Sequence, residues 1–323
     1  MSEENFKKKS YFEKKKMPIE KLTKYYAEVR KEEYKNGKEL SEAGIKFRKK
    51  TRFIPELVVK ADRLASKEKI VIIGDEKNLK TDKPKIFACC HVGGNDVQRA
   101  LDVIDTSAYL LLGDPGEVYR MFIYNALKLN GVIPLEIDDK EDRHLAYLRS
   151  VELLKKGGNL LIFPEGAWNV HPTAIVNKTF KGAVRMAKET GAEIIPIGME
   201  QYDDTFVVNI GKNYSISKDT YKSEDELNKE LRDKLATLKW EIMEHMPKTT
   251  REELPTQEEF QQAIVDRCNF GYGFTLDDVF REQFHDKYIT EPEEVYGFLD
   301  NLDIDSSNAF LAKDKLELAR KKK

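Results

Sequence analysis

The chain has 323 residues, 40% of them hydrophobic and 35% charged, and a formal net charge of −2. This length suits one large domain with extensions or two domains. The near-neutral charge argues against a nucleic-acid partner, because nucleic-acid-binding domains are usually basic. Three cysteines, two of them adjacent, give neither a disulfide framework nor metal-ligand spacing, so we expect no metal and a reducing, cytoplasmic setting. The first residues lack the apolar core of a signal peptide, and no apolar run is long enough to span a bilayer.

Residues 1–66 predict a basic helical segment. The segment is rich in Lys, Glu and Tyr with few turn signals, and residues 1–50 hold 16 Lys and Arg against 9 Glu. Two interpretations of this charge are open. One is a solvated helix face, and the other is a peripheral contact with anionic lipid at the inner face of the membrane, where each basic residue contributes about 1 kcal/mol.

Residues 67–216 predict an α/β core. Short apolar runs such as IVIIG and IFACC alternate with helical patterns, one of which covers residues 117–130. This alternation is typical of a mixed β-sheet flanked by helices, in which functional residues usually lie in the loops that follow the strands. Residues 217–323 are polar again and predict a helical C-terminal extension.

The loop HVGGND directly follows the apolar run IFACC and holds a candidate catalytic pair. We expect His91 at the end of a strand and Asp96 in the first turn of the next helix. Gly93 and Gly94 would let the chain reverse so that both side chains face one cleft. Histidine is the side chain best suited to accept a proton near neutral pH, and a carboxylate on its other nitrogen fixes the tautomer. The alternative is that Asp96 only caps the helix.

Other strand-end loops carry polar residues as well, and their order resembles the motifs of the lysophospholipid acyltransferase family, the glycerophosphate and acylglycerophosphate acyltransferases. The family's first motif is His, four residues, then Asp, and its third is Phe-Pro-Glu-Gly. The resemblance covers roughly residues 85–210. The matching positions are His91 and Asp96, then Gly131 to Pro134, then Phe163 to Gly166, then Phe180 to Ala183, and last Ile194 to Ile197.

The resemblance implies an O-acyltransferase on an α/β fold. His91 would deprotonate an acceptor hydroxyl as it attacks an acyl thioester, and Asp96 would orient His91. Backbone N–H groups of the Gly93-Gly94 turn, or those at the start of the following helix, would bind the oxyanion. The thioester of acyl-CoA or acyl carrier protein would be a co-substrate, and no bound cofactor is needed. The residues expected to bind substrate are Gly93, Gly94, Gly131, Phe163, Pro164, Glu165, Gly166, Trp168 and Lys181.

Two departures from the family pattern leave the acceptor open. The arginine that usually follows the second motif is absent, and Glu136 stands nearby. The third motif is followed by Ala167 and Trp168 in place of Thr-Arg or Ser-Arg. An arginine fork is the natural ligand of a phosphate, and both of the family's usual arginines are missing here. The acceptor could therefore be a lysophospholipid, another lipid or a sugar. Trp168 would suit stacking on a sugar or lining an acyl groove, and Lys181 or Arg143 could replace the missing charge.

Three alternatives remain at this point. The first is a lipid- or partner-binding protein without catalysis on the same scaffold. The second is a hydrolase that holds a metal between His91, Asp96 and Glu165, although zinc sites usually recruit more nitrogen or sulfur ligands. The third is a covalent acyl-cysteine route through Cys89 or Cys90. For these two residues we favour a packing role, as small buried side chains in a central strand.

Overall fold

The computed structural model describes residues 9, 13–14, 16–37, 40–113, 116, 118–120, 127–172, 174–247, 250–268, 275–283 and 305. The chain divides into a compact unit of residues 1–284 and a second unit of residues 285–323, and the described helices and strands all lie in the first. Helices from both predicted extensions belong to this unit together with the α/β core. The predicted boundaries at residues 66 and 216 stay predictions, and the C-terminal RKKK run lies outside the described residues.

The centre of the unit is an eight-stranded mixed sheet with the order β1-β7-β6-β2-β5-β3-β4, and β8 pairs with β6. The pairs β1–β7, β6–β2, β2–β5, β5–β3 and β3–β4 are parallel, while β6 pairs antiparallel with both β7 and β8. The strands are β1 Lys69–Asp75, β2 Lys85–Cys89, β3 Tyr109–Gly113, β4 Val132–Leu135, β5 Leu160–Ile162, β6 Glu193–Tyr202, β7 Thr205–Ile210 and β8 Tyr214–Ser215.

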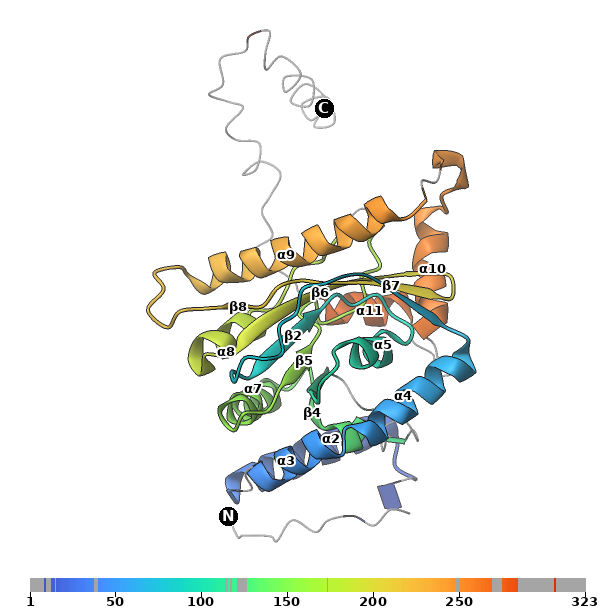
Figure 1. Ribbon diagram of the computed structural model, residues 1–323. Coiled ribbons are helices and arrows are strands. Elements are labelled where there is room, and N and C mark those ends of the chain that lie inside the picture. The colour runs from blue at the N-terminus through green and yellow to red at the C-terminus, as the bar shows by residue number, and fades with distance from the viewer. Residues whose placement is uncertain are drawn as a thin grey trace. The chain divides into compact units, whose positions relative to one another are not determined.

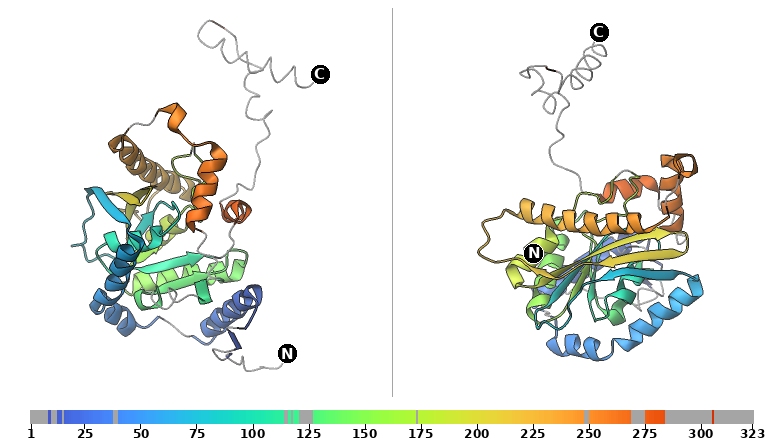
Figure 2. Two further views of the ribbon diagram at one scale, coloured as in Figure 1. Left: turned by 90° about the vertical axis from the view of Figure 1, so that its right-hand side faces the viewer. Right: turned by 45° about the horizontal axis from the view of Figure 1, so that its top comes forward.

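Helices cover both faces of the sheet (Figures 1 and 2). Helices α7, α8 and α9 contribute to the hydrophobic core on one face, and α5 contributes to the core on the other. Helix α4 packs against α5, and α2 packs against α7. The helices are α2 Ile19–Lys35, α3 Glu42–Lys50, α4 Phe53–Ser66, α5 Asp96–Val103, α7 Lys140–Lys155, α8 Gly182–Thr190, α9 Glu224–His245, α10 Gln257–Cys268 and α11 Leu276–Glu282, with short 3₁₀ turns η1 Val118–Arg120 and η2 Arg251–Glu253.

Strand β2 shows why the sequence folds in this way. All five of its residues are buried, and alternate side chains enter different cores: Ile86 and Ala88 face α7, α8 and α9, whereas Phe87 and Cys89 face α5. A strand covered on both faces needs a continuous apolar run, which is what IFACC supplies. The loop that leaves β2 is therefore fixed at the centre of the sheet, between its two neighbours β6 and β5.

The structure confirms the predicted α/β fold with a mixed sheet flanked by helices. Helices α7 and α8 end at glycines with positive φ, 76° at Gly157 and 75° at Gly191, where a residue in the left-handed region closes each helix. The helix predicted over residues 117–130 is described only at its ends: a 3₁₀ turn covers residues 118–120, and a helical turn covers residues 127–130.

Candidate active site

The loop after β2 brings His91 and Asp96 together. His91 Nδ1 lies 2.7 Å from Asp96 Oδ2, and the same oxygen accepts hydrogen bonds from the backbone N–H groups of Val92 and Gly93, both at 2.8 Å. The Asp96 side chain is 1% exposed. Because a buried carboxylate holding three donors cannot rotate freely, it fixes both the loop and the imidazole plane. The proton on Nδ1 then points at Asp96, which makes Nε2 the basic nitrogen of the ring.

The capping alternative for Asp96 is wrong by one residue. Asn95 is the N-cap of α5, and Asp96 is the first residue of the helix. The Asn95 side chain does not cap the helix but donates a 2.8 Å hydrogen bond to Glu68 at the end of α4. Asp96 is therefore available to the histidine, and α4 is tied to the start of α5.

The glycine turn has the geometry that the sequence predicted, with one correction. Gly93 and Gly94 have φ values of 91° and 61°, in the region that favours glycine. The Gly93 N–H group, however, donates to Asp96 and is therefore not an oxyanion donor in this arrangement. Gly93 contributes to the site by letting Asp96 fold back under His91.

Glu165 of the third motif positions the histidine from the neighbouring strand end. It is fully buried, and its two oxygens accept hydrogen bonds from the backbone N–H groups of His91 (3.0 Å) and Asn177 (2.8 Å). Burial raises the pKa of the Glu165 carboxyl, and the positive charge of the buried Lys239 on α9 opposes that rise. Direct contact of Glu165 with a substrate stays a prediction, whereas its hold on the His91 backbone is visible.

Aromatic rings flank the histidine. The Phe163 ring lies 4.5 Å from the His91 ring, centroid to centroid, and the Trp168 ring lies 6.3 Å away at an interplanar angle of 78°. Between them, Pro164 accepts a hydrogen bond from the Phe180 N–H group, and Gly166 turns the chain with a φ of 76°. The residues of the third motif thus lie beside the loop that holds His91.

Two predicted substrate-binding residues have structural partners of their own. Lys181 forms an ion pair with Asp225 on α9, with 2.7 Å between the charged atoms. Gly131 has a φ of 109°, and a Cβ atom there would come within 2.7 Å of the Tyr109 ring. Packing therefore requires the glycine at 131, and contact of either residue with substrate stays a prediction.

The acyl-cysteine alternative is disfavoured by the surroundings of the two thiols. Cys89 and Cys90 are both 0% exposed, and burial raises the pKa of each thiol. A buried thiol that stays protonated at neutral pH is a poor nucleophile. Both side chains act as small core residues on opposite faces of the sheet.

The described part of the chain contains no set of ligands for the metal ion of the hydrolase alternative. No group of three or more His, Cys, Asp or Glu side chains there is arranged to hold an ion. In the candidate site, both oxygens of Glu165 are used by backbone N–H groups, and Asp96 is used by the His91 loop.

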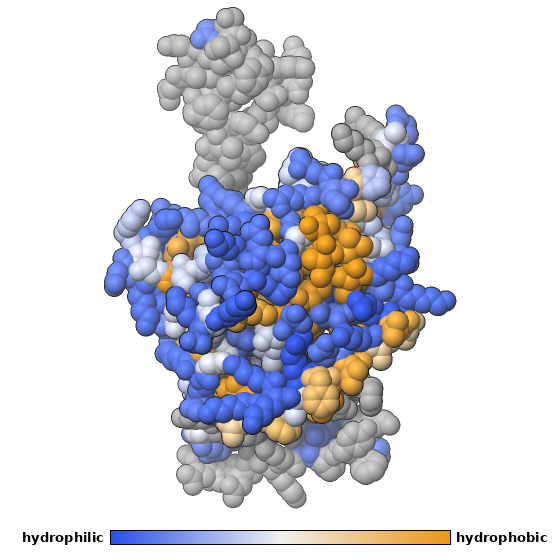
Figure 3. Space-filling model, in the orientation of Figure 1, coloured by the Kyte–Doolittle hydropathy of each residue, from blue (hydrophilic) through white to orange (hydrophobic). Residues whose placement is uncertain are grey.

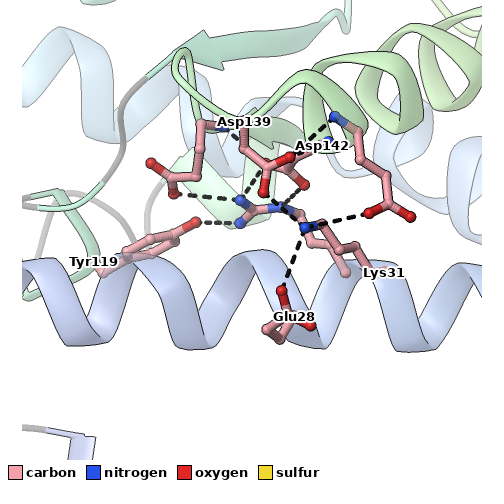
Figure 4. Close-up of polar contacts among 8 residues, drawn as sticks. Glu28, Lys31, Tyr119, Asp139 and Asp142 are labelled. Atoms are coloured by element: carbon pink, nitrogen blue, oxygen red, sulfur yellow. Dashed lines mark hydrogen bonds and ion pairs between the residues drawn. The ribbon is translucent and has the colours of Figure 1, made fainter.

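The end of β4, where the family's arginine is missing, holds an ionic cluster that the sequence did not reveal (Figure 4). Arg30, from helix α2, donates to both oxygens of Asp142 at 2.9 and 2.6 Å and lies 3.3 Å from Glu136. Lys31 forms ion pairs with Asp139, at 2.7 Å, and with two glutamates. No local pattern could signal the pairs with Asp139 and Asp142, because these partners lie more than 100 residues from Lys31 and Arg30 in the sequence.

Comparison with known proteins identifies the core. A family model described as Acyltransferase matches residues 70–200. This segment belongs to the acyltransferase family. Asp96 and Glu165, the two carboxylates that hold His91 in place, lie inside the match. The resemblance inferred from the motifs is therefore confirmed. Helices α2, α3, α4, α9, α10 and α11 lie outside it.

Two curated relatives illustrate the similarity. The chain is 29% identical over 129 residues to a chloroplastic 1-acyl-sn-glycerol-3-phosphate acyltransferase of Arabidopsis thaliana, a stretch that covers 40% of this chain and 35% of the relative. It is 27% identical over 151 residues to a 1-acyl-sn-glycerol-3-phosphate acyltransferase of Borreliella burgdorferi, covering 46% and 58%. The chain thus spans between about a third and three fifths of these relatives.

A solved structure is also similar. The 1-acyl-sn-glycerophosphate acyltransferase PlsC of Thermotoga maritima superposes with a TM-score of 0.48 at 17% identity, covering 74% of this chain and 88% of that one.

Proposed function

We propose that the protein is an O-acyltransferase that moves an acyl group from an acyl-CoA or acyl carrier protein thioester to a hydroxyl of a glycerolipid acceptor. The observation that carries the proposal is the His91–Asp96 pair, at 2.7 Å in the loop after β2, inside a segment that matches the acyltransferase family. The names of the curated relatives support a lysophospholipid as the acceptor class. A binding protein without catalysis would not need an oriented base backed by a buried carboxylate.

The chemistry follows from the orientation of the imidazole. His91 Nε2 accepts the proton of the acceptor hydroxyl as its oxygen attacks the thioester carbonyl. The Asp96 carboxylate stabilises the resulting imidazolium. When the tetrahedral intermediate collapses, the new C–O bond remains, the C–S bond breaks, and the imidazolium returns its proton to the leaving thiolate. General-base help of this kind contributes about 10²–10⁴-fold in rate.

The charge at the end of β4 bears on which lysophospholipid is used. Arg30 is fully engaged there by two carboxylates, Asp142 and Glu136, so its guanidinium is not presented as a fork for a phosphate monoester. We therefore favour an acceptor whose headgroup is not a bare phosphate at this position, such as a lysophospholipid with a substituted phosphate. A lysophosphatidate acceptor would require its charge to be met elsewhere in the site.

A groove between α4 and α5 is a suitable place for the acyl chain. It runs alongside the helix that begins at Asp96, and five of its eleven lining residues are apolar, with the charged residues Arg52, Glu56 and Asp62 among the others. A groove of this character would shield a hydrocarbon chain from water while leaving the thioester near the start of α5. Its lining includes Pro55, Val58, Val59, Gln98, Leu101 and Leu127.

Helices α3 and α4 provide a surface suited to peripheral contact with lipid. The apolar side chains Phe47, Phe53, Leu57 and Leu64 are between 59% and 77% exposed, and apolar surface lies along the lower right of Figure 3 over α4. Arg48, Lys49 and Lys50 end α3 beside this surface. Exposed apolar residues next to basic ones favour an anionic membrane surface. No helix among the described residues has the length and apolarity needed to cross a bilayer.

The proposal is tested by thiol release and product analysis. The purified chain is given acyl-CoA or acyl carrier protein donors of several lengths, each with lysophosphatidate, lysophosphatidylcholine, lysophosphatidylethanolamine, glycerol 3-phosphate or a sugar. We expect thiol release that requires a lysophospholipid, with an acylated lipid as the product. Release of no thiol with any pair, from a protein that binds donor or acceptor, would favour the binding-protein alternative. Acylation of the sugar alone would refute the lipid acceptor.

A further inference from the structure

The segment that follows the third motif packs on the C-terminal helices, outside the part of the chain that matches the family. Residues 167–170 contribute to a hydrophobic cluster with α10 and α11, separate from the two cores of the sheet. Trp168 packs against this cluster from its edge. Its buried members are Ala167, Val170, Ile264, Val265 and Val279, with Phe260, Leu276 and Phe280 packed around them.

The same segment is attached to the catalytic histidine. The Asn169 N–H group donates a 2.9 Å hydrogen bond to the backbone oxygen of His91, and the Trp168 ring meets the His91 ring edge-on at 6.3 Å. Residues 168 and 169 therefore contact the histidine on one side, while their neighbours contact α10 and α11 on the other. A displacement of either helix would move the indole that borders His91.

A second contact joins the segment to the end of α11. His171 Nε2 lies 3.1 Å from Gln283 Oε1, and the His171 ring packs 5.6 Å from the Phe280 ring. His171 thus links the two sides of the interface, so apolar packing and a polar contact hold the same segment.

We propose that α10 and α11 hold Trp168 in place as a wall of the acceptor site, which makes Trp168 a specificity-determining residue and the C-terminal helices part of the active site. The inference rests on the acyl-transfer function proposed above. A large apolar ring beside His91 would exclude water and press the acceptor hydroxyl toward Nε2. If the ring is released, water competes with the acceptor for the thioester. The acyl group then leaves as a free carboxylic acid, with the thiol as the other product.

The test uses the full-length chain with a single tryptophan. The chain has two tryptophans, and Trp240 on α9 is 52% exposed, so Trp240→Phe leaves Trp168 as the only indole emitter. In this background, Val279→Asp places a charge in the cluster, where the valine is 3% exposed. Asp277→Asn, at an exposed position of the same helix, is the matched control. Gln283→Ala is a milder variant that removes only the contact with His171.

Three quantities are measured on each variant: the emission maximum of Trp168, the KM for acceptor and for donor, and the ratio of acylated acceptor to free thiol. In Val279→Asp we expect red-shifted emission, an acceptor KM raised at least about tenfold, an unchanged donor KM, and thiol release that exceeds acylated product. Gln283→Ala should change the acceptor KM in the same direction by about two- to tenfold, the effect of one net hydrogen bond. Asp277→Asn should match the Trp240→Phe parent.

Red-shifted Trp168 emission with an unchanged acceptor KM and full coupling of thiol release to acylation would overturn the inference. So would emission that stays unshifted in a folded Val279→Asp protein, because α11 would then not hold the ring. If the Trp240→Phe parent and wild type both lack acceptor-dependent thiol release, the proposed function itself has failed, which is a different result. Should Val279→Asp not fold, Gln283→Ala decides the question by the same measurements.

Discussion

Replacing Asp96 by asparagine should abolish most of the catalysis while leaving the fold intact. In the native loop a single oxygen of Asp96 accepts the His91 Nδ1–H and two backbone N–H groups at 2.7–2.8 Å. An amide removes the charge that stabilises the imidazolium, and its NH₂ group favours the wrong tautomer of His91. The equivalent change in a Ser-His-Asp triad lowers kcat about 10⁴-fold. We expect a loss of about 10³–10⁴ here, equivalent to roughly 4–5.5 kcal/mol of transition-state stabilisation.

The effect on stability should be smaller than the effect on rate. Hydrogen bonds to a charged group contribute about 1.5–3 kcal/mol, and neutral ones about 0.5–1.5 kcal/mol. Weakening the two backbone bonds should therefore lower the free energy of unfolding by about 2–3 kcal/mol. Asp102→Asn is the matched control, because Asp102 lies on the same helix with a side chain only 5% exposed and pairs with Arg63, away from His91.

Acceptor-dependent thiol release gives kcat for the three proteins, and urea unfolding gives their stability. Asp102→Asn should lose stability and keep kcat within about twofold of wild type, because its ion pair is partly exposed and remote from the base. The reasoning is refuted if a folded Asp96→Asn protein retains kcat within tenfold of wild type. It is also refuted if the two variants lose activity equally.

Three further predictions test other parts of the site. Lys239→Met removes the charge that opposes the raised pKa of Glu165, so this pKa should rise further. The acid limb of the kcat/KM profile should then move to higher pH, and an unmoved limb contradicts the role given to the Glu165 carboxylate. Leu101→Trp should fill the groove beside α5 and shift the preferred donor to shorter acyl chains, which a donor series measures. Leu57→Asp should weaken flotation with anionic vesicles about tenfold or more, because burying a leucine contributes about 1.5–3 kcal/mol. Leu254→Asp, at a similarly exposed leucine outside α3 and α4, should not weaken it.

Local signals explain why the sequence predicted so much of the core. The run IFACC must be buried on both faces to be stable, and the loop after it contains the glycines that a sharp reversal requires. His91 and Asp96 are only five residues apart, so their meeting depends on one turn. The same holds for the glycine ends of α7 and α8, where a left-handed residue closes each helix.

Contacts between distant segments could not be predicted in this way. In the sequence, nothing distinguishes Arg30 from the other charged residues of its helix. Its role depends on the packing of α2 against α7, which brings it to Asp142, 112 residues away. The packing of Trp168 against α10 and α11 could not be predicted from the sequence around it, because the apolar residues of those helices follow it by about a hundred positions. The sequence also left open whether Asp96 caps the helix or orients His91, because Asp is a good cap. The structure has the cap at Asn95 and pairs Asp96 with His91.

The central claim is that His91 is the base of an acyl transfer. Its most direct test is acceptor-dependent thiol release under single-turnover conditions by wild type, His91→Ala and His144→Ala, the last a histidine at an exposed position of α7. We predict that His91→Ala loses at least about 10²-fold in rate, that His144→Ala keeps the wild-type rate, and that both variants bind donor as wild type does. Release by a folded His91→Ala protein at the wild-type rate would contradict the account.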